Sequence, residues 1–450
     1  MAGEGQQLSI GALCDTGIAD LQTGPFGSQL HAHDYVDDGV PVVPTEAIRG
    51  RQIDHSVLPR ITLAKAQELE RHRLRSGDIL FARRGVQATG HIGCVREAED
   101  GFICGTGAIR LRVDRRNDKV DPDYLSHVLA DPVSVQWFKF HAIGATMPNL
   151  NEGIIRSFPV SLPPIDEQRA IAHMLGTLDD KIELNRRMSE TLEAMARGLF
   201  KSWFVDFDPV RAKAEGRDPR LPQPLADLFP ARFVDSDLGE IPEGWEVGTL
   251  RDVAEHPRRG VKPSKIKPET PYIALEHMPR RRIALADWGA GDGLESSKFE
   301  FRRNEILFGK LRPYFHKVGV APVDGVCSTD IVVVGAKSKS WFGFVLGHMS
   351  SGKFVDYANA NSTGTKMPRT SWADMAQYDL ALPPHRLATA FSSLMLPAVE
   401  GIIAGIHQSR TLAALRDALL PKLVSGELRV NDAEKFIERA TASCLTQRGE

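Results

Sequence analysis

The chain has 450 residues, which is enough for two or three domains that each bury a core of their own. Hydrophobic residues make up 42% and charged residues 25%, as in ordinary soluble globular proteins, and the formal net charge of −2 excludes a chain that is basic overall. The five cysteines have no C-x-x-C spacing, and no basic leader or run of about 18 apolar residues occurs, so we expect a cytoplasmic protein with reduced thiols and no membrane span.

Residues 1–162 have the pattern of a domain of mixed strands, loops and some helix. The β-rich runs DILFARRGV (Asp78–Val86) and GAIRLRVD (Gly107–Asp114) are bounded by glycine and aspartate, which favour turns. The stretch DYLSHVLADPVSVQWFKF (Asp123–Phe140) has helical spacing, and Pro132 interrupts it.

Residues 163–205 predict a long helix that follows the proline pair of PPIDEQRAIAHMLGTLDDKIELNRRM. Apolar residues recur along it mostly at steps of three and four, as in a helix that packs along another helix. These residues are Ile171, Leu175, Leu178, Ile182, Met188, Leu192, Met195, Leu199 and Trp203. Asn185 is a polar member of this stripe, and a polar residue in a helix seam tends to fix the register of the two helices.

The rest of the chain repeats this order. Residues 206–240 are rich in proline and charge and predict an irregular linker, and residues 241–382 predict a second domain of strands and loops. A second proline pair then opens a second long helix over residues 383–428, in which we expect Pro397 to cause a kink. Residues 429–450 have the pattern of a loosely held tail.

Matching segments indicate an internal duplication. PVVPTEAI (Pro41–Ile48) resembles PYIALEHM (Pro271–Met278), GDILFARRG (Gly77–Gly85) resembles NEILFGKLR (Asn304–Arg312), and GATMP and GTKMP recur in the same order. The first helical stripe shifted by 220 positions is apolar at eight of nine positions: Phe391, Met395, Ala398, Ile402, Gln408, Leu412, Leu415, Leu419 and Leu423.

We therefore predict an α+β fold in which two duplicated mixed α/β domains are separated by two long helices packed as an antiparallel coiled coil. The residues expected to pack between the helices are Ile171, Leu175, Leu178, Ile182, Leu192, Leu199, Phe391, Ile402, Leu412 and Leu419. Each helix would be roughly 60 Å long at 1.5 Å per residue, so a domain at each end of such a rod could measure a distance.

The motifs of catalytic and metal sites are incomplete. GHMSSGKF (Gly347–Phe354) nearly matches a P-loop, but Phe354 has no hydroxyl for magnesium, and a helix-to-loop junction is the better interpretation. HAHD (His31–Asp34) could hold a metal but has no further ligands nearby, and it is better explained as a polar loop. The carboxylates Asp179 and Asp180 are expected on a solvated helix face or in a partner surface. We expect no catalysis by this chain itself.

Basic residues favour contacts with nucleic acid locally rather than in bulk. Lys and Arg minus Asp and Glu give 17 − 20 = −3 for residues 1–162 and 20 − 16 = +4 for residues 241–382. Basic loops suit phosphate contacts, and arginines in them can bind guanine edges. Basic pairs follow the repeated ILF strand in both domains, and a further cluster lies in the second. The candidate DNA-binding residues are Arg83, Arg84, Lys310, Arg312, Arg258, Arg259 and Lys262.

The central block PPIDEQRAIAHMLGTLDDKIELNRRM and its continuation LFKSWFVDFDPVRAKAEG resemble the specificity subunits of type I restriction-modification systems. The segments that precede and follow this block also resemble that family, and they occur in the same order: GPFGSQL…DYVDDGVPVV, GDILFARRG and LGEIPEGWEVGTL. The resemblance covers the chain up to about residue 430. The second helix lacks the DEQ triplet that follows the first proline pair.

The resemblance implies a subunit without an active site, in which each of two target recognition domains reads one half of a split sequence in double-stranded DNA and the paired helices set the spacing. It also implies two methyltransferase subunits that modify adenine with S-adenosylmethionine, and restriction subunits that use ATP and magnesium.

Two other functions stay open on the sequence. A restriction or modification enzyme that acts alone would cleave or methylate DNA as the purified chain. A helical scaffold with two protein-binding domains would not bind duplex DNA in a salt-dependent way, whereas phosphate contacts release counterions.

Overall fold

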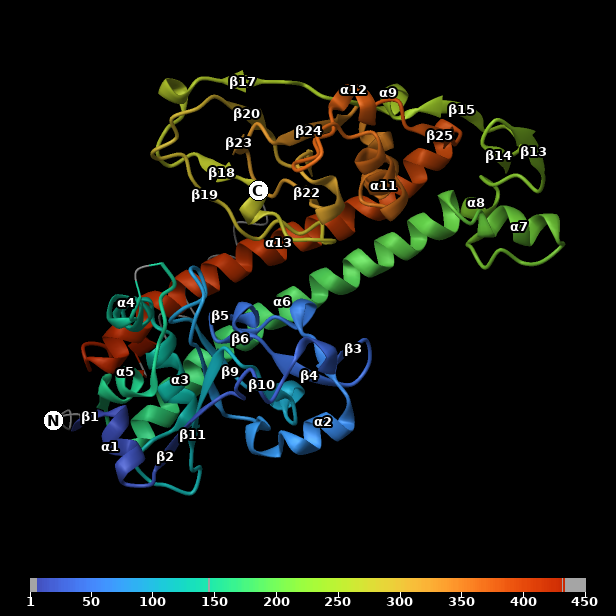
Figure 1. Ribbon diagram of the computed structural model, residues 1–450. Coiled ribbons are helices and arrows are strands. Elements are labelled where there is room, and N and C mark those ends of the chain that lie inside the picture. The colour runs from blue at the N-terminus through green and yellow to red at the C-terminus, as the bar shows by residue number, and fades with distance from the viewer. Residues whose placement is uncertain (1–5, 145, 431, 434–450) are drawn as a thin grey trace. The chain divides into compact units, whose positions relative to one another are not determined.

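Figure 1 shows the computed structural model of the chain, which describes residues 6–144, 146–430 and 432–433. The chain divides into two compact units, and each is described by itself. Unit 1 comprises Met1–Asp180 and Leu412–Glu450, and unit 2 comprises Lys181–Thr411. Most of the predicted tail, from residue 434 on, lies outside the described residues.

Unit 1 is built from short strands and helices. They are β1 (Gln6–Ser9), α1 (Ile10–Asp15), β2 (Ala19–Thr23), β3 (Tyr35–Val36), β4 (Val40–Val43), β5 (Ile48–Arg49), β6 (Gln52–Ile53), β7 (Arg60–Ile61), α2 (Leu63–Glu68), β8 (Ile79–Ala82), β9 (Ile92–Cys94), β10 (Ile103–Cys104), β11 (Ala108–Val113), α3 (Pro122–Ala130), α4 (Pro132–His141), α5 (Glu152–Ser157) and β12 (Pro159–Leu162). The helical stretch divides at Pro132, as predicted, because Asp131 ends α3 and Pro132 begins α4.

Unit 2 is more regular than predicted over residues 206–240. Its elements are α7 (Asp208–Ala214), α8 (Gln223–Ala226), β13 (Phe233–Ser236), β14 (Gly239–Pro242), β15 (Glu246–Thr249), α9 (Leu250–Val253), β16 (Ala254–Glu255), β17 (Gly260–Val261), β18 (Pro271–Ile273), β19 (Gly289–Ala290), β20 (Lys298–Phe301), β21 (Ile306–Gly309), β22 (Val318–Val320), β23 (Gly325–Cys327), β24 (Ile331–Ala336), α10 (Phe342–Met349), α11 (Gly352–Ala360), α12 (Trp372–Met375) and β25 (Asp379–Leu382). The linker over 206–240 was predicted to be irregular, but it forms α7, α8 and the β13–β14 hairpin because Val210 and Phe229 are buried in the core with Trp203.

The two units have the same sheet plan. One antiparallel sheet has the strand order β2-β11-β8-β9 in unit 1 and β16-β24-β21-β22 in unit 2. The strands that carry ILF, β8 and β21, occupy the same inner position and are fully buried, which is why their sequences are continuous apolar runs. A second sheet contains one parallel pair, β4 with β10 in unit 1 and β18 with β23 in unit 2.

Two helices of 40 residues, α6 (Ile165–Phe204) and α13 (His385–Val424), pack against each other (Figure 1). As the residue numbers rise along α6 they fall along α13, so the helices are antiparallel, as predicted. The contacts that show this are Asp179 with Arg416, Asn185 with Ser409, and Trp203 with Phe391. The boundary between the units crosses both helices, whereas the predicted domain boundaries set the helices apart as segments of their own; those boundaries stay a prediction.

Helix α13 is more apolar than the sequence analysis expected. By length and composition it could span a membrane, with an 18-residue window of mean hydropathy 1.6. Single polar residues such as Glu400 interrupt the apolar residues of α13, so the helix contains no unbroken apolar stretch of about 18 residues. Inside the protein 44% of that window is buried, and Phe391, Ile402 and Ile403 lie in the core of unit 2. The helix also continues without a break through Pro397, where a kink stays a prediction.

Candidate nucleic-acid interface

The basic loop of unit 1 begins where strand β8 ends. Arg83 is half-buried, and its Nε donates a hydrogen bond to the side-chain oxygen of Asn149 at 3.1 Å. Arg84 is exposed, and its Nη2 makes a long hydrogen bond of 3.4 Å to the Thr106 hydroxyl. The guanidinium of Arg84 therefore lies at the surface, while the half-buried guanidinium of Arg83 is held in place by its hydrogen bond to Asn149.

Lys310 occupies in unit 2 the position that Arg83 occupies in unit 1. Each residue donates its backbone N–H to a neighbouring strand segment and accepts a backbone hydrogen bond at its carbonyl. The bonds are Arg83 N to Gly107 O (2.9 Å), Leu150 N to Arg83 O (2.7 Å), Lys310 N to Asp330 O (2.9 Å) and Thr370 N to Lys310 O (3.1 Å). A cation is therefore held at the same place in both sheets.

The second members of the two basic pairs are not equivalent. The repeat of GDILFARRG as NEILFGKLR places Arg84 opposite Leu311, and these two residues make the corresponding β-bridges. Arg312 instead matches Gly85, and both have a left-handed backbone, with φ of 52° and 121°. The mismatch arises because the basic pair is contiguous in one loop and split by a leucine in the other.

Each basic loop is bonded to a second loop that carries an exposed methionine. We call these the methionine loops: residues 143–149, of which 145 lies outside the described residues, and residues 363–369. In each loop the first and last residues exchange two backbone hydrogen bonds of 2.9 to 3.0 Å. Met147 is 61% exposed and Met367 is 49% exposed. The repeat of GATMP as GTKMP can be found in the sequence, but no sequence pattern predicts that these segments lie on the same surface as the basic residues.

A further basic cluster surrounds His256 in unit 2. Burial lowers the pKa of His256, and the nearby cations Arg258, Lys310 and Arg259 lower it further, against a hydrogen bond to a β24 carbonyl that raises it. These charges come from two loops, the one after β16 and the one after β21. The fold therefore brings together three of the predicted DNA-binding residues.

Two parts of this cluster differ in their surroundings. Arg259 is half-buried and forms an ion pair with Glu305, whose carboxylate also accepts the Arg302 N–H at 2.7 Å. Arg258, in the same loop, and Lys262 are both exposed. Arg259 thus has a structural partner, whereas the charges of Arg258 and Lys262 are accessible to solvent.

The ten predicted helix-packing residues are all at least half-buried. Those with at most 4% exposure are Ile171, Leu175, Leu178, Phe391, Ile402, Leu412 and Leu419. Those that are half-buried are Ile182, Leu192 and Leu199.

Two other members of the predicted stripe are exposed. Met188 is 52% and Met195 is 66% exposed. The predicted stripe passes from Ile182 through Asn185 to Met188 in two steps of three residues, and at 3.6 residues per turn these steps leave Met188 about 120° around the helix from Ile182. The buried face of this half of α6 instead contains Asn185, Ser189, Glu193, Ala196 and Phe200.

Asn185 lies in the helix seam, as its position in the stripe predicts. It is 6% exposed, and its side-chain amide donates to the Ser409 hydroxyl at 3.2 Å. A Cβ on Gly405 would lie 3.7 Å from the Asn185 Cβ, so the two helices approach closely here. This polar pair favours one register of α6 against α13.

Asp179 is not solvated, in contrast to the prediction. It is 3% exposed and accepts hydrogen bonds from Arg51 and, at 2.6 Å, from Arg416 of α13. Arg51 comes from the β5–β6 turn, has a left-handed φ of 65°, and also donates to the Ser126 hydroxyl. Asp180, by contrast, is exposed. Asp179 therefore joins the domain of unit 1 to both helices.

The P-loop-like segment Gly347–Phe354 is a junction between α10 and α11. Phe354 is fully buried in the core. A Cβ on Gly347 would lie 2.1 Å from the Phe200 ring, so glycine is needed there for packing. Core packing thus explains the segment without a nucleotide.

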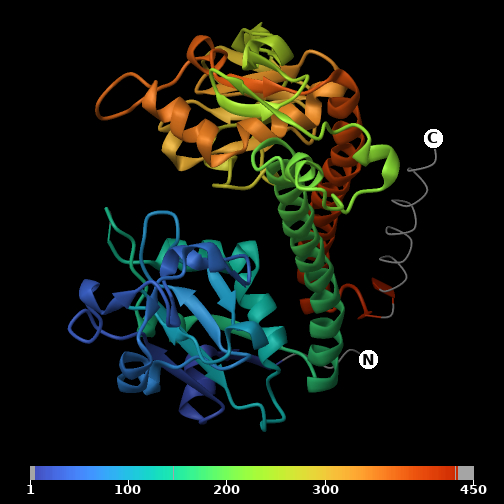
Figure 2. The same cartoon turned by 90° about the vertical axis from the view of Figure 1, so that its right-hand side faces the viewer.

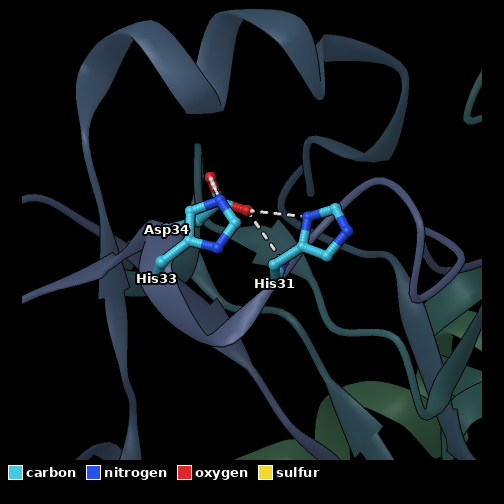
Figure 3. A group of neighbouring side chains, drawn as sticks. All are labelled: His31, His33 and Asp34. Carbon is cyan, nitrogen blue, oxygen red and sulfur yellow. Dashed lines mark hydrogen bonds and ion pairs between the residues drawn. The ribbon is translucent and has the colours of Figure 1, made fainter.

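His31, His33 and Asp34 gather on an exposed loop (Figure 3). Their possible ligand atoms lie within 4.8 Å of one another. The Asp34 carboxylate, however, accepts the His31 N–H at 2.7 Å, and the ammonium of Lys65 is 3.7 Å away, which opposes a bound cation. Capping of a short helical turn explains this cluster, and we assign it no metal.

Comparison with known proteins confirms the resemblance seen in the sequence. The family described as "Type I restriction modification DNA specificity domain" matches residues 51–194. The chain is 28% identical over 330 residues to the type I restriction enzyme MjaIX specificity subunit of Methanocaldococcus jannaschii, covering 70% of this chain and 71% of that one. It is 24% identical over 409 residues to the HindI specificity subunit of Haemophilus influenzae, covering 79% and 87%.

The fold has a counterpart among solved structures. The type I restriction-modification S subunit from M. genitalium superposes with a TM-score of 0.51 at 14% identity, covering 93% of this chain and 95% of that one. This likeness supports the fold of two mixed α/β domains and two long helices.

Proposed function

Since this chain resembles type I restriction enzyme specificity subunits over most of its length, we propose that it is the DNA-binding specificity subunit of such a system. In this proposal unit 1 and unit 2 each read one half of a bipartite target in double-stranded DNA. The length of α6 and α13 determines the spacing between the halves. The chain acts in the cytoplasm and directs the adenine methylation or DNA cleavage that partner subunits perform.

One observation supports the bipartite target above all others. Arg83 and Lys310 end equivalent buried strands, have equivalent backbone hydrogen bonds, and lie beside equivalent methionine loops. A single DNA-binding surface would not require the same arrangement of cation and loop in two separate units. Two copies of one reading surface fit two half-sites, with phosphate contacts from the cations and base contacts from the neighbouring loops.

Helix α6 offers a surface for a partner subunit. Leu184, Met188 and Met195 are 49%, 52% and 66% exposed, and their spacing of four and seven residues places them on one side of the helix. Exposed apolar stripes of this kind are typical of helix–helix interfaces between chains. We propose that a methyltransferase subunit packs here, and that two such subunits join the complex.

The chemistry is assigned to those partners. We propose that S-adenosylmethionine binds the methyltransferase subunits and that ATP and magnesium bind the restriction subunits, while this chain binds no cofactor of its own. The proposal thus treats the chain as a non-catalytic targeting subunit.

Mapping of methylated adenines tests this function. The chain is produced with its methyltransferase partner in a host that lacks other adenine methylation, and modified positions are sequenced across the genome. We expect one motif made of two short specific blocks separated by a fixed number of unspecified bases. A contiguous motif, or no motif when both subunits are present and assembled, would refute the proposal.

A further inference from the structure

We propose that Met147 and Met367 are intercalating side chains, each of which enters the base stack of one DNA half-site beside the adenine that is methylated. This inference rests on the proposed function and adds the residue and the physical act by which each unit opens its half-site.

The exposure of these two side chains is unusual in the same way in both units. Methionine is apolar, and such a side chain stabilises a fold only when it is buried, so an exposed methionine in a loop contributes little within the chain. Both units nevertheless hold one at the same place, 61% exposed in unit 1 and 49% exposed in unit 2. A shared external partner explains this recurrence.

The loops are held firmly at their base. In each loop the backbone pair at the two ends, 143 with 149 and 363 with 369, closes a short hairpin. In unit 1 the hydroxyl of the buried Thr89 also donates to the Pro148 carbonyl at 3.0 Å. In unit 2 the loop after α11 extends from the body of its unit, in orange in Figure 2. A tip fixed in this way can enter a groove without first losing much conformational freedom.

A cation lies at the base of each loop. The next residue along the chain from the unit 1 loop, Leu150, is hydrogen-bonded to Arg83, and the corresponding residue of unit 2 is hydrogen-bonded to Lys310. Lys366 is exposed within the unit 2 loop itself. Arg369 is not counted here, because Asp330 pairs with it at 3.4 Å. Phosphates on either side of a groove would bind such cations, which leaves the methionine directed at the bases.

Further apolar side chains lie in the basic loops themselves. Val86 is 75% exposed and Tyr314 is 50% exposed. Both follow the cation that ends the ILF strand by three or four residues. A surface that combines cations with several exposed apolar side chains fits DNA that is partly unstacked better than DNA bound by phosphate contacts alone.

The occupant we infer is duplex DNA rather than a protein. Apolar residues such as methionine act as wedges between base steps in proteins that deform DNA, and their burial there offsets the cost of unstacking. A methyltransferase must take its adenine out of the stack, and it does so at lower cost where the neighbouring step is already open. A wedge in each half-site would therefore lower the cost of flipping both adenines.

The test uses duplexes that carry the mapped target with 2-aminopurine at successive positions of each half-site, and the chain assembled with its methyltransferase partner. The fluorescence of 2-aminopurine rises when the base is unstacked. We expect the rise to be lost in one half-site for Met147→Ala and in the other for Met367→Ala, with specific affinity about tenfold weaker. Met147→Leu and Met367→Leu should keep the rise.

Matched controls separate this effect from loss of fold. Leu63→Ala in unit 1 and Val247→Ala in unit 2 remove apolar side chains of similar exposure, 63% and 44%, away from these loops, and should leave the fluorescence unchanged. Specific binding with no rise, or a rise that both alanine variants keep, would overturn the inference and leave the proposed function intact. Failure to map any motif would overturn both.

Discussion

Replacement of Asp179 by asparagine should strongly destabilise unit 1. The side chain of Asp179 is 5% exposed, and those of its partners Arg51 and Arg416 are 10% and 20% exposed. Asp179→Asn keeps the shape but removes the charge, which leaves Arg51 largely out of water without its anion, while Arg416 keeps only its pair with the exposed Asp417. Removing one partner of a buried ion pair costs about 3–5 kcal/mol. Since about 1 kcal/mol shifts the melting temperature of a unit of this size by roughly 2–4 °C, we expect a fall of about 6–20 °C.

Asp180→Asn is the matched control. Asp180 is the next residue, its side chain is 80% exposed, and the Arg96 guanidinium is 3.7 Å away. Exposed pairs contribute about 0–1 kcal/mol, so the melting temperature should change by at most about 4 °C. The assay is differential scanning calorimetry of the full chain, in which the transition of one unit should move and that of the other should stay. Equal, small shifts for both variants would refute the reasoning that Asp179 joins the domain to the helices.

Three further substitutions test separate parts of the account. Gly347→Ala should destabilise unit 2 by about 1–3 kcal/mol in urea unfolding, because the new methyl group meets an aromatic ring of α6. Gly352→Ala places its methyl group in open space and should change the stability little. Equal effects of the two substitutions would contradict the packing explanation. Burial raises the pKa of the Glu193 carboxyl, so its protonated form is favoured in the folded chain, and the stability it contributes is present at low pH and lost as the pH rises through that raised pKa. Glu193→Gln should remove this pH dependence from the melting temperature, and an unchanged profile would contradict it. Met195→Glu should block assembly with the methyltransferase subunit in gel filtration, because it places a charge within the exposed apolar stripe. Ala194→Glu adds the same charge at the exposed neighbouring position, about 100° around the helix, and should not block assembly; assembly of both variants would exclude this face of α6 as the interface.

The periodic features of the fold could be predicted from the sequence. The positions of the two long helices follow from proline pairs and apolar spacing, and their antiparallel packing follows from a stripe that recurs 220 residues later. Asn185 was assigned to the seam for the same reason. These features are local or repeated, so one sequence contains enough information to find them.

The parts that were predicted wrongly depend on partners far apart in the chain or on the register of a segment. Asp179 resembles a solvated helix carboxylate until the turn that carries Arg51, 128 residues earlier, is folded against it. The exposure of Met195 was missed because two successive steps of three residues, from Ile182 to Asn185 and on to Met188, move the predicted stripe off the buried side of the helix. The two basic pairs were expected to share a role, but only Arg83 and Lys310 are equivalent, because the second cation follows directly in one loop and after a leucine in the other.

The candidate surface was predicted only in part. Basic residues after the ILF strand could be found, because two copies of a charge at matching positions stand out from ordinary surface charge. That Met147 and Met367 lie beside them could not be found, since 64 residues separate Arg83 from Met147 in the chain and only the sheet brings their loops together.

The central claim is that each unit reads one half of the target. It is tested most directly by mapping methylated adenines for Arg83→Ala and Lys310→Ala, each assembled with the methyltransferase partner. The account predicts that Arg83→Ala relaxes or abolishes recognition in one block of the motif, and that Lys310→Ala does so in the other block alone. If either substitution altered both blocks equally, or if both altered the same block, the assignment of one half-site to each unit would be contradicted.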